Sequence, residues 1–276
     1  MTEKNVNEGS PVGLLLSALI ILLVAAGLSF LVGGQRGAGE ASQVAQDELE
    51  YITNSLGMQF VRLPAGRFTM GDEGLGYGPE REVGVGAFYM GVHEVTQAQW
   101  EAVMGYNPSH FQDPRRPVDS VPWLDVQIFL EQLNVLEGTN RYRLPSESEW
   151  EYAARAGSES RFFFGEDASL LRRFAWFGAN QNRGTRAVGS LQPSPWGLYD
   201  IYGNVWEWVQ DCWHESYLGA PSDSRSWGGM ECQQAGLRGG GWNNKADNMD
   251  SVARGSYGVR FGDVSNGFRV VLSERR

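Results

Sequence analysis

The chain has 276 residues and a formal net charge of −10, which suits one large domain or two small ones. Without a basic excess, the composition excludes an extended surface for nucleic acid. Glycine accounts for 36 of the 276 residues, against a typical share of about 7%, and no repeat or proline excess accompanies it. This excludes a collagen-like chain. All ten tryptophans lie from Trp100 onward, so we expect tight turns around a core of large rings.

The N-terminal part of the chain carries a long apolar segment. No charged residue occurs between Gly9 and Gln35, and crossing a bilayer takes about 20 apolar residues. A cleavable signal peptide has a shorter apolar region of about 7–15 residues and usually a basic start. The sequence therefore predicts an N-terminal tail over 1–11, a transmembrane signal anchor over 12–34, a linker over 35–56 and a globular domain over 57–276.

Local signals in the predicted domain indicate a few helices among short strands. Two helices begin with capping boxes, in which a hydroxyl residue is followed three positions later by Gln or Glu, and another begins with proline in its first turn. The expected helices are 96–105, 122–138 and 146–157, and the expected strands include 59–63, 67–70 and 267–271. Few helices, short strands and much irregular chain predict an α+β domain.

A series of motifs in fixed order resembles the formylglycine-generating enzyme family, also called sulfatase-modifying factors. The resemblance covers about 57–271. It implies a compact C-type-lectin-like fold with little regular secondary structure, in agreement with the α+β expectation. The motifs are LPAGRFTMG at 63–71, EVTQAQW at 94–100, NPSHF at 107–111, RLPSESEWEYAAR at 143–155, WGLYDIYGNVWEW at 196–208, RGGGW at 238–242 and GFR at 267–269.

The resemblance also implies a structural calcium ion. The family positions that ligate it match Asp200, Gly203, Val205 and Glu207. Calcium takes six to eight oxygens from carboxylates and backbone carbonyls, which this segment offers. The other interpretation is that the segment is only a turn leading tryptophans into the core.

The catalytic cysteine pair of the family is missing from this chain. In the enzymes that pair follows the segment matching 238–242 and binds copper(I), which prefers soft thiolate ligands. Here Asn244 and Met249 stand at or near the two positions. An amide cannot cycle between thiolate and disulfide, so we expect a pseudoenzyme without copper, assign no catalytic residue and leave iron open.

The remaining candidate groups have open roles. Cys212 and Cys232 have no metal-type spacing. They either form a disulfide, which an exported domain permits, or stay buried as thiols. The scattered histidines His93, His110 and His214 do not predict a metal triad.

Carried over from the family, a ligand pocket would be lined by Trp206, Trp242, Asn243, Asn244 and Arg254. Asparagine beside tryptophan suits recognition better than redox chemistry. The alternative is that the asparagines only shape the loop.

Two functions follow from these expectations. The first is a membrane-anchored, exported binding, accessory or regulatory module that meets a protein, peptide or glycan partner at its loop surface, on the periplasmic or extracellular side. The second is a non-copper oxidoreductase, similar to the pyoverdine-maturation branch of the family, that acts on an exported peptide or small molecule.

Overall fold

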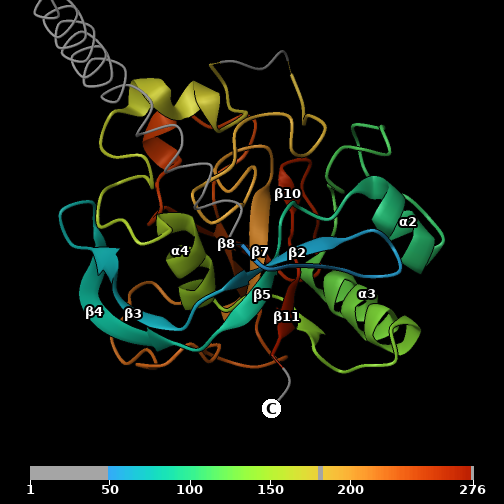
Figure 1. Ribbon diagram of the computed structural model, residues 1–276, viewed down its shortest axis with the longest axis horizontal. Coiled ribbons are helices and arrows are strands. Elements are labelled where there is room, and N and C mark those ends of the chain that lie inside the picture. The colour runs from blue at the N-terminus through green and yellow to red at the C-terminus, as the bar shows by residue number, and fades with distance from the viewer. Residues whose placement is uncertain (1–48, 180–182, 275–276) are drawn as a thin grey trace, which may run out of the picture. The chain divides into compact units, whose positions relative to one another are not determined.

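The computed structural model describes residues 49–179 and 183–274 (Figure 1). The expected tail, signal anchor and most of the linker lie outside these residues. Within the described part of the chain, no helix is both long enough and apolar enough to cross a membrane. Leu49–Arg276 forms one compact unit.

A five-stranded sheet with strand order β1-β2-β5-β11-β6 runs through this unit, and all its neighbours pair antiparallel. The strands are β1 (Tyr51–Thr53), β2 (Gln59–Leu63), β5 (Phe88–Gly91), β11 (Val271–Ser273) and β6 (Tyr142–Arg143). Strand β1 falls in the segment expected as a linker, 35–56. Because Tyr51 pairs with Val61 across β1 and β2, the folded unit begins earlier than the sequence indicated.

A second, four-stranded sheet has the order β10-β7-β8-β9. Its strands are β10 (Asn266–Gly267), β7 (Trp206–Cys212), β8 (Gln234–Arg238) and β9 (Arg254–Gly258). The single strand expected over 267–271 is wrong in its extent, because β10 and β11 belong to different sheets. Between them, the carbonyl oxygen of Phe268 accepts from Val95 N and the buried Arg269 leaves the ladder.

Two further strands form a separate antiparallel hairpin, β3 (Gly66–Asp72) and β4 (Tyr77–Val85), at the left of Figure 1. This hairpin contains the strand expected over 67–70. It contacts helix α4 (Glu147–Arg155) through both of its strands.

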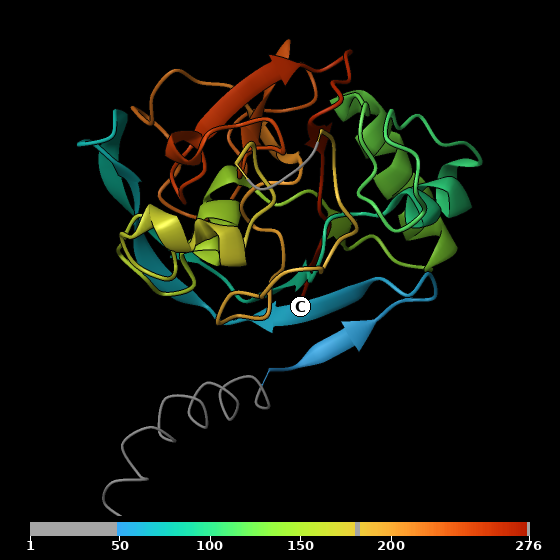
Figure 2. The same ribbon diagram turned by 90° about the horizontal axis from the view of Figure 1, so that it is seen from above.

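The three expected helices are confirmed as α2 (Gln97–Met104), α3 (Trp123–Leu136) and α4. Thr96 and Ser146 both make complete capping boxes, and the side chain of each accepts from the backbone N–H three residues later. Figure 2 shows α2 and α3 (green) together on one side of the domain, with the yellow-green α4 on the other. Two short 3₁₀ helices, Ala168–Arg173 and Ala246–Asn248, complete the regular structure of the described residues.

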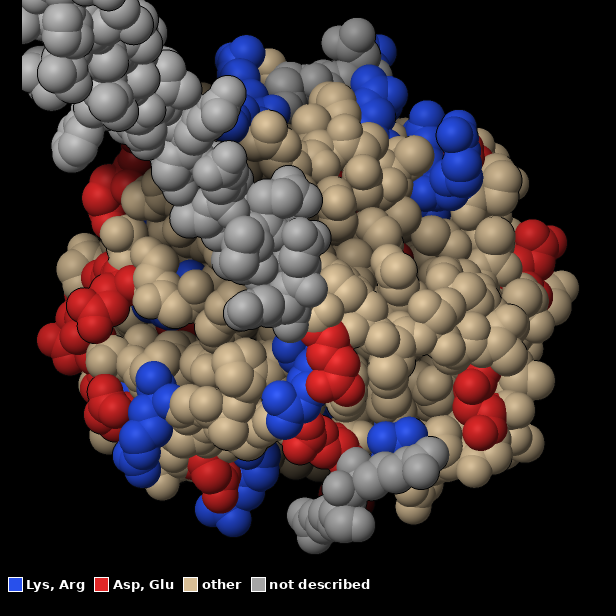
Figure 3. Space-filling view, viewed as in Figure 1, with Lys and Arg blue, Asp and Glu red and all other residues tan. Residues whose placement is uncertain are grey.

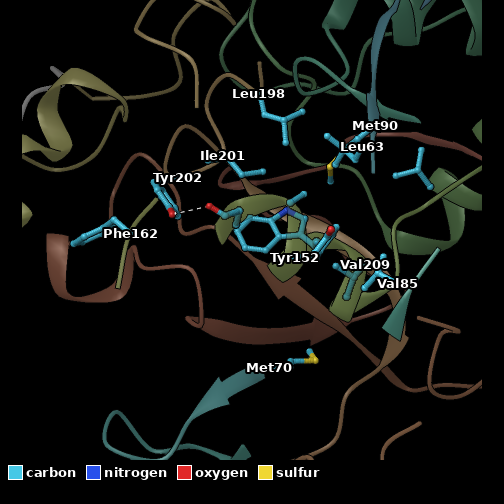
Figure 4. Packing of buried hydrophobic residues seen from close by; sticks show 14 of the residues in the cluster. Leu63, Met70, Val85, Met90, Tyr152, Phe162, Leu198, Ile201, Tyr202 and Val209 are labelled. Carbon is cyan, nitrogen blue, oxygen red and sulfur yellow. Dashed lines mark hydrogen bonds between the residues drawn. The ribbon is translucent and has the colours of Figure 1, made fainter. Parts of the chain in front are cut away.

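The core consists of two clusters of buried side chains. One contains Trp150 with strand residues of β2 to β5 and with Tyr202, and Figure 4 shows Tyr202 and Phe162 at one side of it and Val85 and Val209 at the other. The second contains Trp100 and Phe129, whose rings stack with centroids 5.3 Å apart. Large rings therefore fill the interior, as the composition predicts.

Candidate functional site

The two positions that match the family's cysteine pair are occupied by structural side chains. Oδ1 of Asn244 accepts from Nε1 of Trp206 and from the backbone N–H of Gly241, both at 2.9 Å. Met249 is fully buried in the first core cluster. It packs so closely that a Cβ added at Gly240 would lie 2.8 Å from its sulfur. Neither position presents a thiol that could cycle between thiolate and disulfide.

Part of the expected pocket does come together around this loop. Trp206 and Asn244 are joined by the hydrogen bond above, while Asn243 is exposed to solvent. The ring of Trp242 is half-buried, donates from Nε1 to the carbonyl oxygen of Val264 at 3.1 Å and meets Phe111 edge to face. The result is a surface of two partly covered indoles and one exposed amide, which we call the indole–amide surface (Trp206, Trp242, Asn243 and Asn244).

Arg254 is not part of this surface. Its guanidinium forms two hydrogen bonds to Glu147, at 2.6 and 2.9 Å, and lies over the rings of Tyr217 and Trp213. Only 3% of its side chain is exposed. The expectation that Arg254 would line the same pocket as Trp206 is therefore replaced by a role inside an ionic network.

That network joins α4 to the second sheet. Arg238 contacts Glu151 and lies 3.5 Å from Glu147, and Glu151 also accepts from Arg155 at 3.0 Å. All are buried. Burial acts to raise the pKa of Glu147, but the charges of Arg254 and Arg238 outweigh it and hold that pKa below its usual value. Removing one partner of such a set leaves an uncompensated buried charge.

Asp211 lies at the edge of the network and forms no ion pair with any described residue. Its carboxylate accepts from the backbone N–H groups of Glu147 and Trp227, each at 2.8 Å. Burial, and next the charge of Glu147, raise the pKa of Asp211 to about 7, although the two backbone donors act in the opposite direction. The carboxylate thus ties the N-terminus of α4 to the loop that contains Trp227.

The two carboxylates of the segment expected to hold calcium differ in how far their oxygens are already used. Both carboxylate oxygens of Glu207 accept from Arg269, at 2.6 and 2.7 Å, and one also accepts from Trp150. Oδ2 of Asp200 accepts from Gly189 N at 2.7 Å, whereas its buried Oδ1 has no hydrogen-bond partner among the described residues. No group of three or more His, Cys, Asp or Glu side chains in the described part could hold a metal. The unpartnered Oδ1 of Asp200 is suited to a cation. Glu207 could ligate calcium only if its hydrogen bonds to Arg269 were broken, so calcium stays a prediction.

The two cysteines of the chain are bonded to each other. Cys212 and Cys232 form a disulfide, which resolves the two interpretations left open by the sequence. The histidines do not gather nearby into a site. His214 stacks on Trp227 and contacts the carbonyl oxygen of Cys212, while His110 packs edge-on against Phe111.

Sequence reasoning missed a cavity of about 390 Å³ between β3, the C-terminal end of α4 and Trp196. Its lining includes Phe68, Tyr152, Arg155 and Trp196. The four residues belong to three motifs that are far apart in the chain. The only local signal was the spacing of Tyr152 and Arg155, which lie near one another on the last turns of α4.

The chain matches the family model of the sulfatase-modifying factor enzyme 1-like domain over residues 46–274. It is 28% identical over 244 residues to the chaperone protein LppX of Paenibacillus barcinonensis, covering 71% of this chain and 83% of that one. It is 27% identical to the formylglycine-generating enzyme of Bos taurus, covering 56% of this chain and 58% of that one. The solved structure of PvdO from Pseudomonas aeruginosa superposes with a TM-score of 0.73 at 30% identity, covering 82% of this chain and 98% of that one.

Proposed function

Because the chain belongs to the family of sulfatase-modifying factor enzyme 1-like domains, we propose that it is a membrane-anchored, exported binding or accessory module without formylglycine-generating activity. One observation carries this proposal. At the positions that match the cysteine pair, Asn244 is hydrogen-bonded to Trp206 and Met249 is buried in the core. The disulfide leaves no free thiol among the described residues, and copper(I) chemistry in this family needs thiolates.

The indole–amide surface is the part of the domain that we assign to partner binding. Indole rings that are partly covered supply contact area with little loss of conformational freedom, and the exposed amide of Asn243 can both donate and accept hydrogen bonds. A protein, peptide or glycan could use these groups. The relative named a chaperone protein supports an accessory role, because it matches most of this chain.

The anchor and the exported location rest on two features of the chain. The uncharged segment over 12–34 is long enough to cross a bilayer. The Cys212–Cys232 disulfide is typical of an oxidising compartment, such as the periplasm or the cell exterior. We propose a single-pass protein with its domain on that side.

The similarity to PvdO, which extends over nearly all of that structure, favours one alternative. It is a non-copper oxidoreductase that acts on an exported peptide or small molecule. Such an enzyme would need a metal or cofactor site built from residues other than the cysteines, and iron would be one candidate for it.

Metal analysis of the purified full chain distinguishes the two functions. The chain would be isolated without chelators, and its copper, iron and calcium contents would be measured per mole of protein, before and after incubation with each metal. The binding module predicts neither copper nor iron in stoichiometric amount. One tightly held iron per chain would support the oxidoreductase instead, and one copper would contradict both functions.

A further inference from the structure

The cavity between β3, α4 and Trp196 shares no lining residue with the indole–amide surface. Its volume of about 390 Å³ falls within the range of roughly 300–1,000 Å³ that is usual for small-molecule sites. It therefore offers the domain a second place for a ligand.

One wall of the cavity is aromatic. The rings of Phe68 and Tyr152 lie 5.4 Å apart, and those of Tyr152 and Trp196 lie 4.9 Å apart. The Tyr152 hydroxyl donates to the carbonyl oxygen of Pro64 at 3.2 Å, which fixes its ring. Trp196 is only half-buried, and its indole N–H has no hydrogen-bond partner within residues 49–179 and 183–274. The wall thus presents an apolar face together with one unused donor.

Arg155 is a fixed part of the cavity rather than a free cation. Its guanidinium donates to Glu151 at 3.0 Å and to the carbonyl oxygen of Gly71 at 3.0 Å. Only 9% of the side chain is exposed. Because Glu151 is shared with Arg238, Arg155 gives the base of the cavity a fixed guanidinium whose charge is only partly balanced.

The rim carries unused polar groups of both signs. Neither the guanidinium of Arg67 nor the carboxylate of Glu159 forms an ion pair or a side-chain hydrogen bond within the described part of the chain. Asp72 and Glu80 also line the cavity, although each accepts from one backbone N–H. Figure 3 shows acidic and basic side chains intermixed on the side of the domain formed by β3 and β4.

This combination selects for a particular ligand chemistry. A charged ligand would be attracted to one part of the rim and repelled by another. A neutral ligand with several hydroxyls can accept from Arg67 and Trp196 while it donates to Glu159 and its neighbours. Its less polar ring face would rest against the indole. We propose that the cavity binds a neutral sugar, and this inference rests on the proposed role of the chain as a binding module.

The test is a titration of the full chain with three neutral disaccharides, maltose, mannobiose and chitobiose. The chain would be held in a detergent without sugar headgroups, and binding would be followed by tryptophan fluorescence and by calorimetry. We expect at least one disaccharide to bind at millimolar concentration or below. Trp196→Leu, Arg67→Ala and Glu159→Gln should each weaken its binding, with Arg67→Ala weakening it by roughly tenfold.

Arg115→Ala is the matched control, because the Arg115 side chain is 79% exposed and lies outside the cavity lining. It should bind as the unaltered chain does. If Trp196→Leu fails to fold, the two rim variants still decide the question. Tetralysine and tetraglutamate would be titrated in the same way. Binding of none of the disaccharides, or unchanged binding by both rim variants, would overturn the proposal, as would binding of one of these charged peptides without any disaccharide. The metal contents described above stay independent of these outcomes, so either proposal can fail alone.

Discussion

At the scale of single residues, the domain depends on buried charges whose partners come from distant parts of the chain. Glu147 begins α4 and pairs with Arg254 in β9, while Glu207 in β7 pairs with Arg269. The first pair joins α4 to the second sheet, and the second joins β7 to the segment between β10 and β11. Asp211 differs from these pairs, since its carboxylate accepts from two backbone N–H groups. Because its pKa is raised to about 7, its contribution to stability should depend on pH.

Replacing Asp211 by asparagine should destabilise the domain at pH 5. The carboxylate accepts at both oxygens, and an amide keeps only one of them, so one buried N–H would lose its partner. Leaving such a donor unsatisfied costs about 1–3 kcal/mol. Urea unfolding of Asp211→Asn beside the unaltered chain would measure the loss. Equal free energies of unfolding would show that the two bonds contribute nothing net.

The same pair of proteins tests the pKa of Asp211. That pKa is about 7 in the folded chain and about 3.9 in an unfolded one. Between these values the folded state binds more protons, so the stabilisation from Asp211 is complete below about pH 4 and is lost as the pH rises to about 7. The stability advantage of the unaltered chain over Asp211→Asn should therefore shrink from pH 5 to pH 7. An advantage that grows over this interval would contradict the account.

At the scale of elements, the segment from Asp200 to Glu207 carries the calcium prediction. If calcium binds at Asp200 Oδ1, it stabilises the folded state by mass action, by about 2.7 kcal/mol at a concentration a hundred times its dissociation constant. The melting temperature of the full chain should rise with calcium but much less with magnesium, and Asp200→Ala should abolish the rise. A melting temperature that does not change in calcium would contradict the calcium prediction.

The elements also show which features can be predicted from sequence. The capping boxes at Thr96 and Ser146 determine where α2 and α4 begin, because their hydrogen bonds are local. The division of 267–271 between two sheets was not predicted, since it depends on contacts of Phe268 and Val270 with residues about 170 positions earlier.

The candidate site shows the same difference between features set by local sequence and features set by distant contacts. The motifs identified Asn244 as the replacement for a cysteine, but Arg254, which was expected beside Trp206 in a pocket, binds Glu147 instead. Here a buried carboxylate, Glu147, binds the long side chain of Arg254. Glu147 is far away in sequence, so the sequence around Arg254 does not indicate this contact. The aromatic wall of the cavity was missed for a related reason, because Phe68, Tyr152 and Trp196 meet only in the folded chain.

At the scale of the whole molecule, the disulfide has a structural role. Cys212 and Cys232 are 20 residues apart, and a crosslink that closes a loop of this length typically stabilises a domain by about 2–4 kcal/mol. The Cys212→Ala/Cys232→Ala variant should lose that amount in denaturant unfolding. Its metal content should stay the same, because the thiols have no catalytic part. A copper or iron content that falls in this variant would assign the cysteines to a metal site.

The central claim is that this domain keeps the family fold without oxidising a substrate cysteine, and oxygen consumption tests it most directly. The full chain would be incubated in air with a cysteine-containing sulfatase peptide, with copper(I) or iron(II) added separately, and oxygen uptake would be followed together with the mass of the peptide. Asn244 and Met249 predict no peptide-dependent uptake and an unchanged cysteine. Uptake in proportion to peptide, with conversion of its cysteine, would contradict the account and require an oxidase site built without free thiols.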